Sequence, residues 1–213
     1  MTKREQIIHD YIKFPFYLIT HPIAGFDQLK REGKGKLSVA FVFIFLFSVL
    51  NIATYQYASF LVNFNNPNEL NSIRELSLVV ITILLFSVGN WSITTLFDGK
   101  GKFKDIFLVM SYSLFPQIIL GFPNLLLSYI YASEEVAFYY VLSGIATFLM
   151  VIMIFIGLLV IHEYSLSQTI LTIIATFVAI ALILFVSLLF YNIAQQIIGF
   201  INSLYNEITW RYF

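Results

Sequence analysis

Few residues in this sequence could do chemistry, and they lie far apart. The chain has no cysteine and three histidines, His9, His21 and His162. His162 precedes Glu163 in the sequence HEYS, which lacks the second histidine of the zinc-protease pattern HExxH. A serine protease of the membrane would need a histidine or lysine near its serine, and no histidine lies at the centre of an apolar stretch. We therefore expect no metal site, and we expect His162 to cap a helix or contact lipid headgroups.

Two other short motifs resemble functional patterns without matching them. Residues 98–102 read DGKGK, which lacks the GxxxxGKS or GxxxxGKT pattern of phosphate-binding loops. This segment therefore predicts a tight cytoplasmic turn. Asn90, Trp91 and Ser92 spell a glycosylation acceptor inside an apolar stretch. Because a side chain buried in lipid cannot be glycosylated, we expect Asn90 to hydrogen-bond between helices.

The composition indicates a membrane protein. Of the 213 residues, 59% are hydrophobic and 11% are charged, whereas a soluble domain has about a quarter charged residues. Twelve basic residues balance twelve acidic ones, so no overall positive field favours nucleic acid. The apolar stretches have no ionisable side chain at their centres, which argues against a proton-coupled carrier, a voltage sensor or an intramembrane protease. We expect no enzymatic activity, no cofactor and no small-molecule substrate.

Helices that cross the bilayer must position these residues. The hydrocarbon core is ~30 Å thick, which a helix crosses in about 20 residues, and five charge-free stretches of that length are present. The sequence therefore predicts an all-α, polytopic membrane protein with five transmembrane helices within residues 37–191. Their expected ranges are about 37–62, 76–97, 106–131, 136–161 and 166–191. Residues 1–36 are expected to form a cytoplasmic or interfacial segment, and residues 192–213 a separate amphipathic interfacial helix.

Basic residues are concentrated on alternate connections between these stretches. The N-terminal segment and the loop between the second and third stretches contain ten of the twelve basic residues. These ten are Lys3, Arg4, Lys13, Lys30, Arg31, Lys34, Lys36, Lys100, Lys102 and Lys104. By the positive-inside rule the N-terminus is cytoplasmic and, after five crossings, the C-terminus lies outside. The basic N-terminal residues are expected to rest against anionic lipid headgroups.

Both ends of the chain have amphipathic patterns. The C-terminal pattern has one apolar stripe and a nearly uncharged polar side, so it fits either the lipid interface or an apolar groove of a partner. The apolar stripe consists of Ile193, Ile197, Ile201, Leu204 and Ile208. Near the N-terminus Ile8, Tyr11 and Ile12 begin a similar face. We expect Pro15 to end this first segment and Pro22 to open a second short helix.

The third stretch contains Pro116 and Pro123 with Gly121 between them, so a single straight helix is not expected. We predict a short helix over about 103–115 at or entering the interface, then a break and a crossing to residue 131. Broken helices line substrate sites in transporters, but they also occur as simple kinks. The lack of a nearby charged residue favours the kink. Further along, Ser165 and Gln168 predict a capping box for the fifth helix.

Three segments resemble the Ypt-interacting protein (Yip) family. They are HPIAGFDQLKREGKGKLSVA before the first stretch, DGKGKFKDIFLVMSYSLFPQII across the second loop and third stretch, and HEYSLSQTI after the fourth. The resemblance covers roughly residues 15–190. The positions that carry it are Pro22, Gly99, Gly101, Tyr112, Ser113, Pro116, His162, Glu163 and Ser165.

This resemblance implies a five-span membrane protein with a cytoplasmic N-terminal region and no catalytic residues. Eukaryotic members are associated with Rab-type GTPases and vesicle traffic, and they have a long N-terminal extension that this chain lacks. The chain is more similar to compact bacterial members, some of which are encoded beside ABC transporters. The leading hypothesis is a non-catalytic accessory or scaffold protein of the bacterial plasma membrane that binds other membrane proteins, with ABC transporter subunits as candidate partners. The alternatives are a small transporter or channel gated at Pro116–Pro123 and, third, an intramembrane enzyme.

Overall fold

The computed structural model describes residues 3–212, all of whose regular elements are helical. Residues 1, 2 and 213 of the expected terminal segments lie outside the described residues. The elements are α1 (Lys3–Ile8), a π-helix (His9–Lys13), α2 (Phe14–Thr20), α3 (Pro22–Arg31), α4 (Leu37–Tyr57), a 3₁₀ turn (Pro67–Glu69), α5 (Ser72–Leu96), α6 (Phe103–Tyr112), α7 (Phe115–Leu127), a 3₁₀ turn (Ser133–Glu135), α8 (Val136–His162) and α9 (Leu166–Tyr212).

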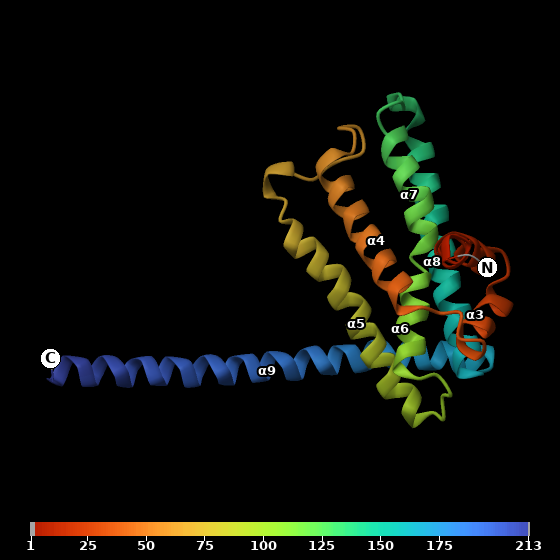
Figure 1. Ribbon diagram of the computed structural model, residues 1–213. Coiled ribbons are helices and arrows are strands. Elements are labelled where there is room, and N and C mark those ends of the chain that lie inside the picture. The colour runs from red at the N-terminus through yellow and green to blue at the C-terminus, as the bar shows by residue number, and fades with distance from the viewer. Residues whose placement is uncertain (1–2, 213) are drawn as a thin grey trace.

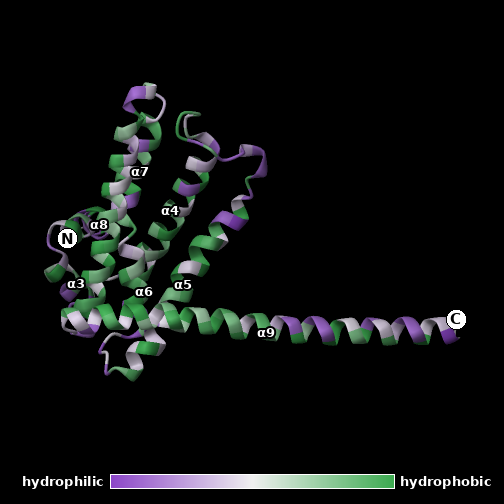
Figure 2. Ribbon diagram, turned by 180° about the vertical axis from the view of Figure 1, so that it is seen from behind, coloured by the Kyte–Doolittle hydropathy of each residue, from purple (hydrophilic) through white to green (hydrophobic). Residues whose placement is uncertain are grey.

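Five helical segments are long and apolar enough to cross a membrane, which confirms the predicted fold class. They are Leu37–Tyr57, Ser72–Leu96, Phe103–Leu127, Ser133–His162 and Leu166–Arg211. Four of them, α4, α5, the pair α6–α7, and α8, stand side by side, whereas α9 leaves one end of this bundle sideways (Figure 1). Figure 2 shows that apolar residues dominate the bundle and the first half of α9, while polar residues gather in the connections and the second half of α9.

The third span is broken, as predicted, but its first half lies elsewhere than expected. The break falls at Ser113 and Leu114, directly before Pro116, which occupies the first turn of α7 where a missing N–H costs no hydrogen bond. We expected the first half to lie at the interface or to enter it. Instead α6 is in the core, because α4, α5 and α8 all pack against it, and its residues 106–112 are all buried.

The N-terminal segment is part of the same core. Phe14 and Leu18 of α2 and Phe26 and Leu29 of α3 are buried in one cluster with α6 and α8. Pro15 does not end the first helical run, contrary to expectation. The N–H of Phe14 bonds to the carbonyl of His9, one residue further back than in an α-helix, and this register shift accommodates the proline ring.

The last helix is one continuous element of 47 residues. The separate helix expected from residue 192 is therefore not separate: a change from apolar to polar side chains does not interrupt backbone hydrogen bonds, and Gly199 alone does not break a helix. At 1.5 Å per residue α9 is roughly 70 Å long. It packs across α5 near its start, and its most apolar stretch is almost entirely exposed.

Candidate functional site

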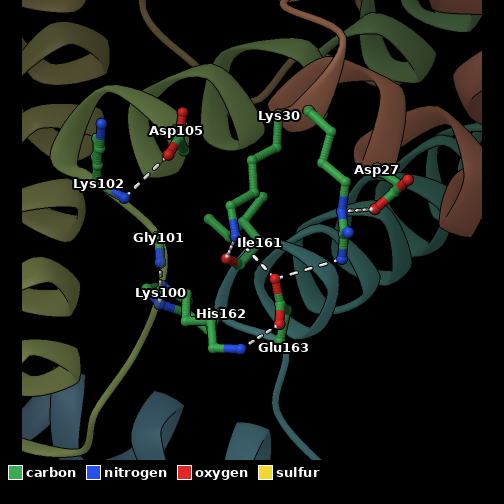
Figure 3. A network of polar contacts seen from close by, with 10 residues as sticks. Asp27, Lys30, Lys100, Gly101, Lys102, Asp105, Ile161, His162 and Glu163 are labelled. Atoms are coloured by element: carbon green, nitrogen blue, oxygen red, sulfur yellow. Dashed lines mark hydrogen bonds and ion pairs between the residues drawn. The ribbon is translucent and has the colours of Figure 1, made fainter.

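Three parts of the chain meet at the basic end of the bundle, where α9 also begins (Figure 1). They are the loop between α5 and α6, the last turn of α8 with the residues that follow it, and the C-terminal turn of α3 (Figure 3). Polar side chains and backbone groups from these parts form hydrogen bonds and ion pairs with one another. We call these residues the His162 cluster. Its members are Lys30, Arg31, Asn90, Gly99, Lys100, Gly101, His162, Glu163, Tyr164 and Thr176.

His162 is the centre of the cluster and is 2% exposed. The backbone N–H of Gly101 donates to its Nδ1 over 3.3 Å, and Nε2 lies 3.2 Å from Oδ1 of Asn90. Both bonds form together only if the proton is on Nε2, which gives a neutral imidazole that donates to Asn90. The ring of Tyr164 stacks on the imidazole at a centroid distance of 5.2 Å. Both ring nitrogens of His162 are thus occupied inside the protein, which contradicts the helix-capping or headgroup role expected for this side chain.

The hydrogen-bond chain continues from Asn90 into α9. The amide nitrogen of Asn90 donates to Oγ1 of Thr176 over 3.0 Å, and that hydroxyl donates to the carbonyl of Thr172 over 2.7 Å. Asn90 therefore makes the interhelical hydrogen bonds predicted for it. Because donors and acceptors alternate without a gap, this chain joins α5, α8 and α9 at little desolvation cost.

Two glycines allow the loop between α5 and α6 to lie against the imidazole. A β-carbon on Gly99 would lie 2.6 Å from Nδ1 of His162 and 2.7 Å from the hydroxyl of Tyr164. A β-carbon on Gly101 would lie 2.8 Å from Cε1 of His162. These glycines serve close backbone approach. The DGKGK segment thus forms a covering loop for the histidine.

Glu163 gathers the positive charges of the cluster. Its carboxylate accepts from Nζ of Lys100 at 2.6 Å and lies 3.4 Å from both Nζ of Lys30 and Nη2 of Arg31. The hydrogen bonds from Lys100 and Lys30 hold the pKa of this carboxyl below its ordinary value. Glu163 also ends α8 in the left-handed conformation, with φ of 58°, which is unfavourable for a residue with a side chain. Three cations thus fix a strained residue.

The π-helix, α2 and α3 together form the N-terminal hairpin (residues 9–31), and Lys30 connects this hairpin to α8 by a second contact. Its ammonium donates to the carbonyl of Ile161 over 2.8 Å, which is one of the carbonyls at the end of α8 that lack a partner within the helix. A cation at a helix C-terminus also interacts favourably with the helix dipole. The end of α8 is therefore capped by the side chain of α3.

The other motif positions lie in three places. Ser165 and Gln168 form the predicted capping box of α9 beside the cluster, with Gln168 Oε1 accepting from the N–H of Ser165 over 3.0 Å. Tyr112 lies at the end of α6, where its hydroxyl accepts from the N–H of Lys36 over 3.0 Å. Ser113 and Pro116 are at the break between α6 and α7, and Pro22 begins α3. The structure thus brings Gly99, Gly101, His162, Glu163 and Ser165 together and leaves the rest apart.

Two members of the cluster were missed from the sequence. Thr176 completes the hydrogen-bond chain, and Tyr164 donates its hydroxyl to the carbonyl of Phe97 over 2.9 Å. One signal was available for the threonine. Thr169, Thr172 and Thr176 recur at helical spacing in an apolar helix, and all three are buried. Such a stripe indicates the face of α9 that packs on another helix.

The polar groups of the cluster pair with one another, so the arrangement links helices. Across residues 3–212, no three histidine, cysteine or carboxylate side chains are grouped as a metal site would require. The hydrogen bonds and ion pairs of the cluster hold α3, α5, α8 and α9 together, and we call this network the interhelical lock.

Comparison with known proteins finds the same family that the sequence motifs resemble. The family model of the Yip1 domain matches residues 16–188, which includes the His162 cluster, the break between α6 and α7, and Pro22. No curated protein and no solved structure matches the chain.

Proposed function

Since the chain belongs to the Yip1 domain family, we propose that this integral membrane protein acts without catalysis, by binding other membrane proteins as an accessory or scaffold subunit. The proposed partner is a subunit of an ABC transporter. The chemistry of the His162 cluster supports a structural role, because its ionisable groups are engaged with one another.

One observation carries this proposal: the apolar half of α9 has almost no cover from its own chain. Exposed side chains occur on every side of this stretch, including Phe177, Leu182, Phe185, Leu188 and Phe190. A helix that is apolar all round is stable only against lipid or against other helices. The length of α9 beyond α5 thus offers a surface that a partner's transmembrane helix could cover.

The second half of α9 supports the same proposal. Its polar side consists mainly of uncharged amides and hydroxyls, including Gln195, Gln196, Asn202 and Asn206. Its apolar stripe is continuous with the apolar half, because the helix has no break. A stripe of this kind fits an apolar groove of a partner or the lipid interface.

The proposed orientation has the N-terminus and the His162 cluster in the cytoplasm and the C-terminus outside, in a bacterial plasma membrane. Ten of the twelve basic residues support it. Because α9 leaves the bundle sideways (Figure 1) and Thr176 holds it to α5, this orientation requires α9 to change direction beyond that contact and cross the bilayer there.

The proposal is tested by purifying the full chain from native membranes in mild detergent and identifying co-purified proteins by quantitative mass spectrometry. Leu188→Asn places an amide on the exposed surface of α9. Val151→Asn places the same amide on an exposed surface of α8 and is the control. We expect ABC transporter subunits to co-purify with the wild type and with Val151→Asn, and to be lost with Leu188→Asn. A protein that purifies alone in every case contradicts the proposal.

A small transporter or channel is the second candidate, and one observation favours it. A cleft of about 270 Å³ between α4, α5, α6 and α8 reaches Leu114 at the break in the third span. Asn51, Glu75 and Thr82 are the polar members of a lining that is otherwise apolar. Flux through liposomes that contain only this protein, abolished by Thr82→Phe, would support this candidate. Flux that appears only in the presence of a partner complex would support the accessory role.

A further inference from the structure

The N-terminal hairpin forms an open cavity that is separate from the His162 cluster. The cavity lies between the π-helix with α2 on one side and the end of α3 with the following turn on the other. Its volume is about 440 Å³, within the range of about 300–1,000 Å³ for small-molecule sites. The lining side chains are His9, Lys13, Phe14, Tyr17, Gln28 and Lys34. Basic, aromatic and hydrogen-bonding groups thus share one cavity.

The two lysines of this cavity differ in how they are paired. The ammonium of Lys34 lies 2.9 Å from Oε1 of Gln28 and 2.9 Å from the carboxylate of Glu32. Lys13 is exposed, and within the described part of the chain its ammonium has no hydrogen-bond or ion-pair partner. Glu5 lines a neighbouring cavity that shares Lys13. The cavity thus presents one uncompensated positive charge.

Asp10, the carboxylate of the same π-helix as Lys13, is already paired. Asp10 is bonded to His9 and forms an ion pair with Lys36. Burial raises the pKa of Asp10, but the hydrogen bonds from Lys36 and His9 outweigh it and hold the pKa below its ordinary value. Asp10 is therefore an anion that neutralises Lys36, and the charge of Lys13 stays available.

The surroundings of the cavity indicate its depth in the bilayer. The N-terminal hairpin lies beside α8 (Figure 1), and its buried Phe14 packs edge-on against Tyr112 of the third span. Apolar side chains project from the same helices, among them Ile12, Phe16 and Ile23, which are 51%, 46% and 65% exposed. A helix with exposed isoleucines and lysines together lies in the lipid interface, with ammonium groups at the level of the phosphates.

We propose that this cavity binds the headgroup of an anionic phospholipid. The ammonium of Lys13 pairs with the phosphate, and the second lysine, Lys34, adds to the positive field. The hydroxyl of Tyr17 and the amide of Gln28 offer hydrogen-bond donors to the headgroup oxygens. Phe14 forms an apolar floor beneath the glycerol part. A free phosphate would use the same cations, but it would gain nothing from this floor or from the adjoining exposed isoleucines.

The test uses the full chain, purified in detergent and titrated with phosphatidylglycerol or with phosphatidylcholine of the same acyl chains, and counts bound lipid by native mass spectrometry. Lys13→Gln removes the unpaired cation, Lys34→Gln the paired one, and Lys13→Arg keeps the charge. Lys104→Gln is the control, because Lys104 is an exposed lysine outside the cavity at the same end of the molecule. Inorganic phosphate is added in a competing series.

We expect the wild type to prefer phosphatidylglycerol, and Lys13→Gln to weaken that binding about fivefold, the usual effect of one lysine near an anionic surface. Lys34→Gln should have a smaller effect, and Lys13→Arg and Lys104→Gln almost none. Equal losses in Lys13→Gln and Lys104→Gln would mean a diffuse positive field and overturn the proposal. An equal affinity for the two lipids would do the same, as would full displacement of the lipid by inorganic phosphate.

Discussion

His162 leaves no room for a β-carbon on the loop that covers it. We predict that Gly99→Ala lowers the free energy of unfolding by about 1–3 kcal/mol, because the new methyl group would meet both the imidazole and the hydroxyl of Tyr164 at less than 3 Å. The measurement is thermal unfolding of the detergent-solubilised protein. Gly144→Ala in α8 is the control, because nothing lies within 4 Å of its β-carbon position. A Gly99→Ala protein as stable as the control would show that the loop does not lie on the imidazole.

The carboxylate of Glu163 gives the lock a dependence on pH. Its pKa is lowered in the folded protein by Lys100 and Lys30, so its stabilising effect is complete above the ordinary pKa and is lost as the pH falls through the lowered one. We predict that Glu163→Gln is less stable than the wild type at neutral pH and that the difference shrinks in acid. Unfolding midpoints measured across this pH range provide the test.

A matched variant separates this effect from general loss of charge. Glu134→Gln removes an exposed carboxylate at the other end of the bundle, away from Lys30 and Lys100. It should leave the unfolding midpoint nearly unchanged at every pH. A difference between the wild type and Glu163→Gln that stays constant down to strong acid would contradict the ion-pair assignment.

At the level of helices, the sequence predicted where each helix begins and ends better than which helices pack against it. The apolar stretches located α4, α5 and α8 within a few residues at most boundaries, because the thickness of the bilayer fixes the length of a span. The proline pair predicted the break before α7. The central position of α6 was missed, because apolar composition looks the same whether a helix faces lipid or protein.

The burial of the N-terminal hairpin was also missed from the sequence. Lys13 and its basic neighbours favoured a surface position for the hairpin, yet Phe14, Leu18, Phe26 and Leu29 on its other side pack into the core.

For the site, Gly99 and His162 were both identified as motif residues. Nothing in their local sequence indicates that they touch, since this contact depends on how α5 and α8 pack.

The unbroken course of α9 can be measured directly. The chain has no cysteine, so two introduced cysteines would be the only sites for spin labels. Labels at Leu188 and Ile201 on a continuous helix are expected to lie about 20 Å apart, with a narrow distribution. Labels at Phe138 and Val151 within α8 have the same spacing and serve as the reference. A broad distribution for the α9 pair alone would mean a hinge near residue 191.

For the whole molecule, the direction of α9 decides where the chain ends. We predict that alkaline phosphatase fused after Phe213 is active and that a fluorescent protein fused there is dark, because both reporters respond to the side of the membrane and five crossings place this end outside. Fusions at residue 133, in the connection before α8, are the control and should also read outside. An inactive phosphatase and a bright fluorescent protein after Phe213 would mean that α9 lies along the cytoplasmic face.

The hydrogen-bond chain through Asn90 also sets an order of events during synthesis. Asn90 and Thr176 are 86 residues apart in the chain, and a ribosome adds about 5–20 residues per second. Asn90 therefore waits roughly 4 to 17 seconds in the translocon or the bilayer before the threonine that completes its bonding has been made. A nascent chain that stops before α9 leaves the amide nitrogen of Asn90 without its threonine partner, and an unpaired amide is costly in hydrocarbon. The contact that joins α5 to α9 in the finished protein is therefore absent from an unfinished one.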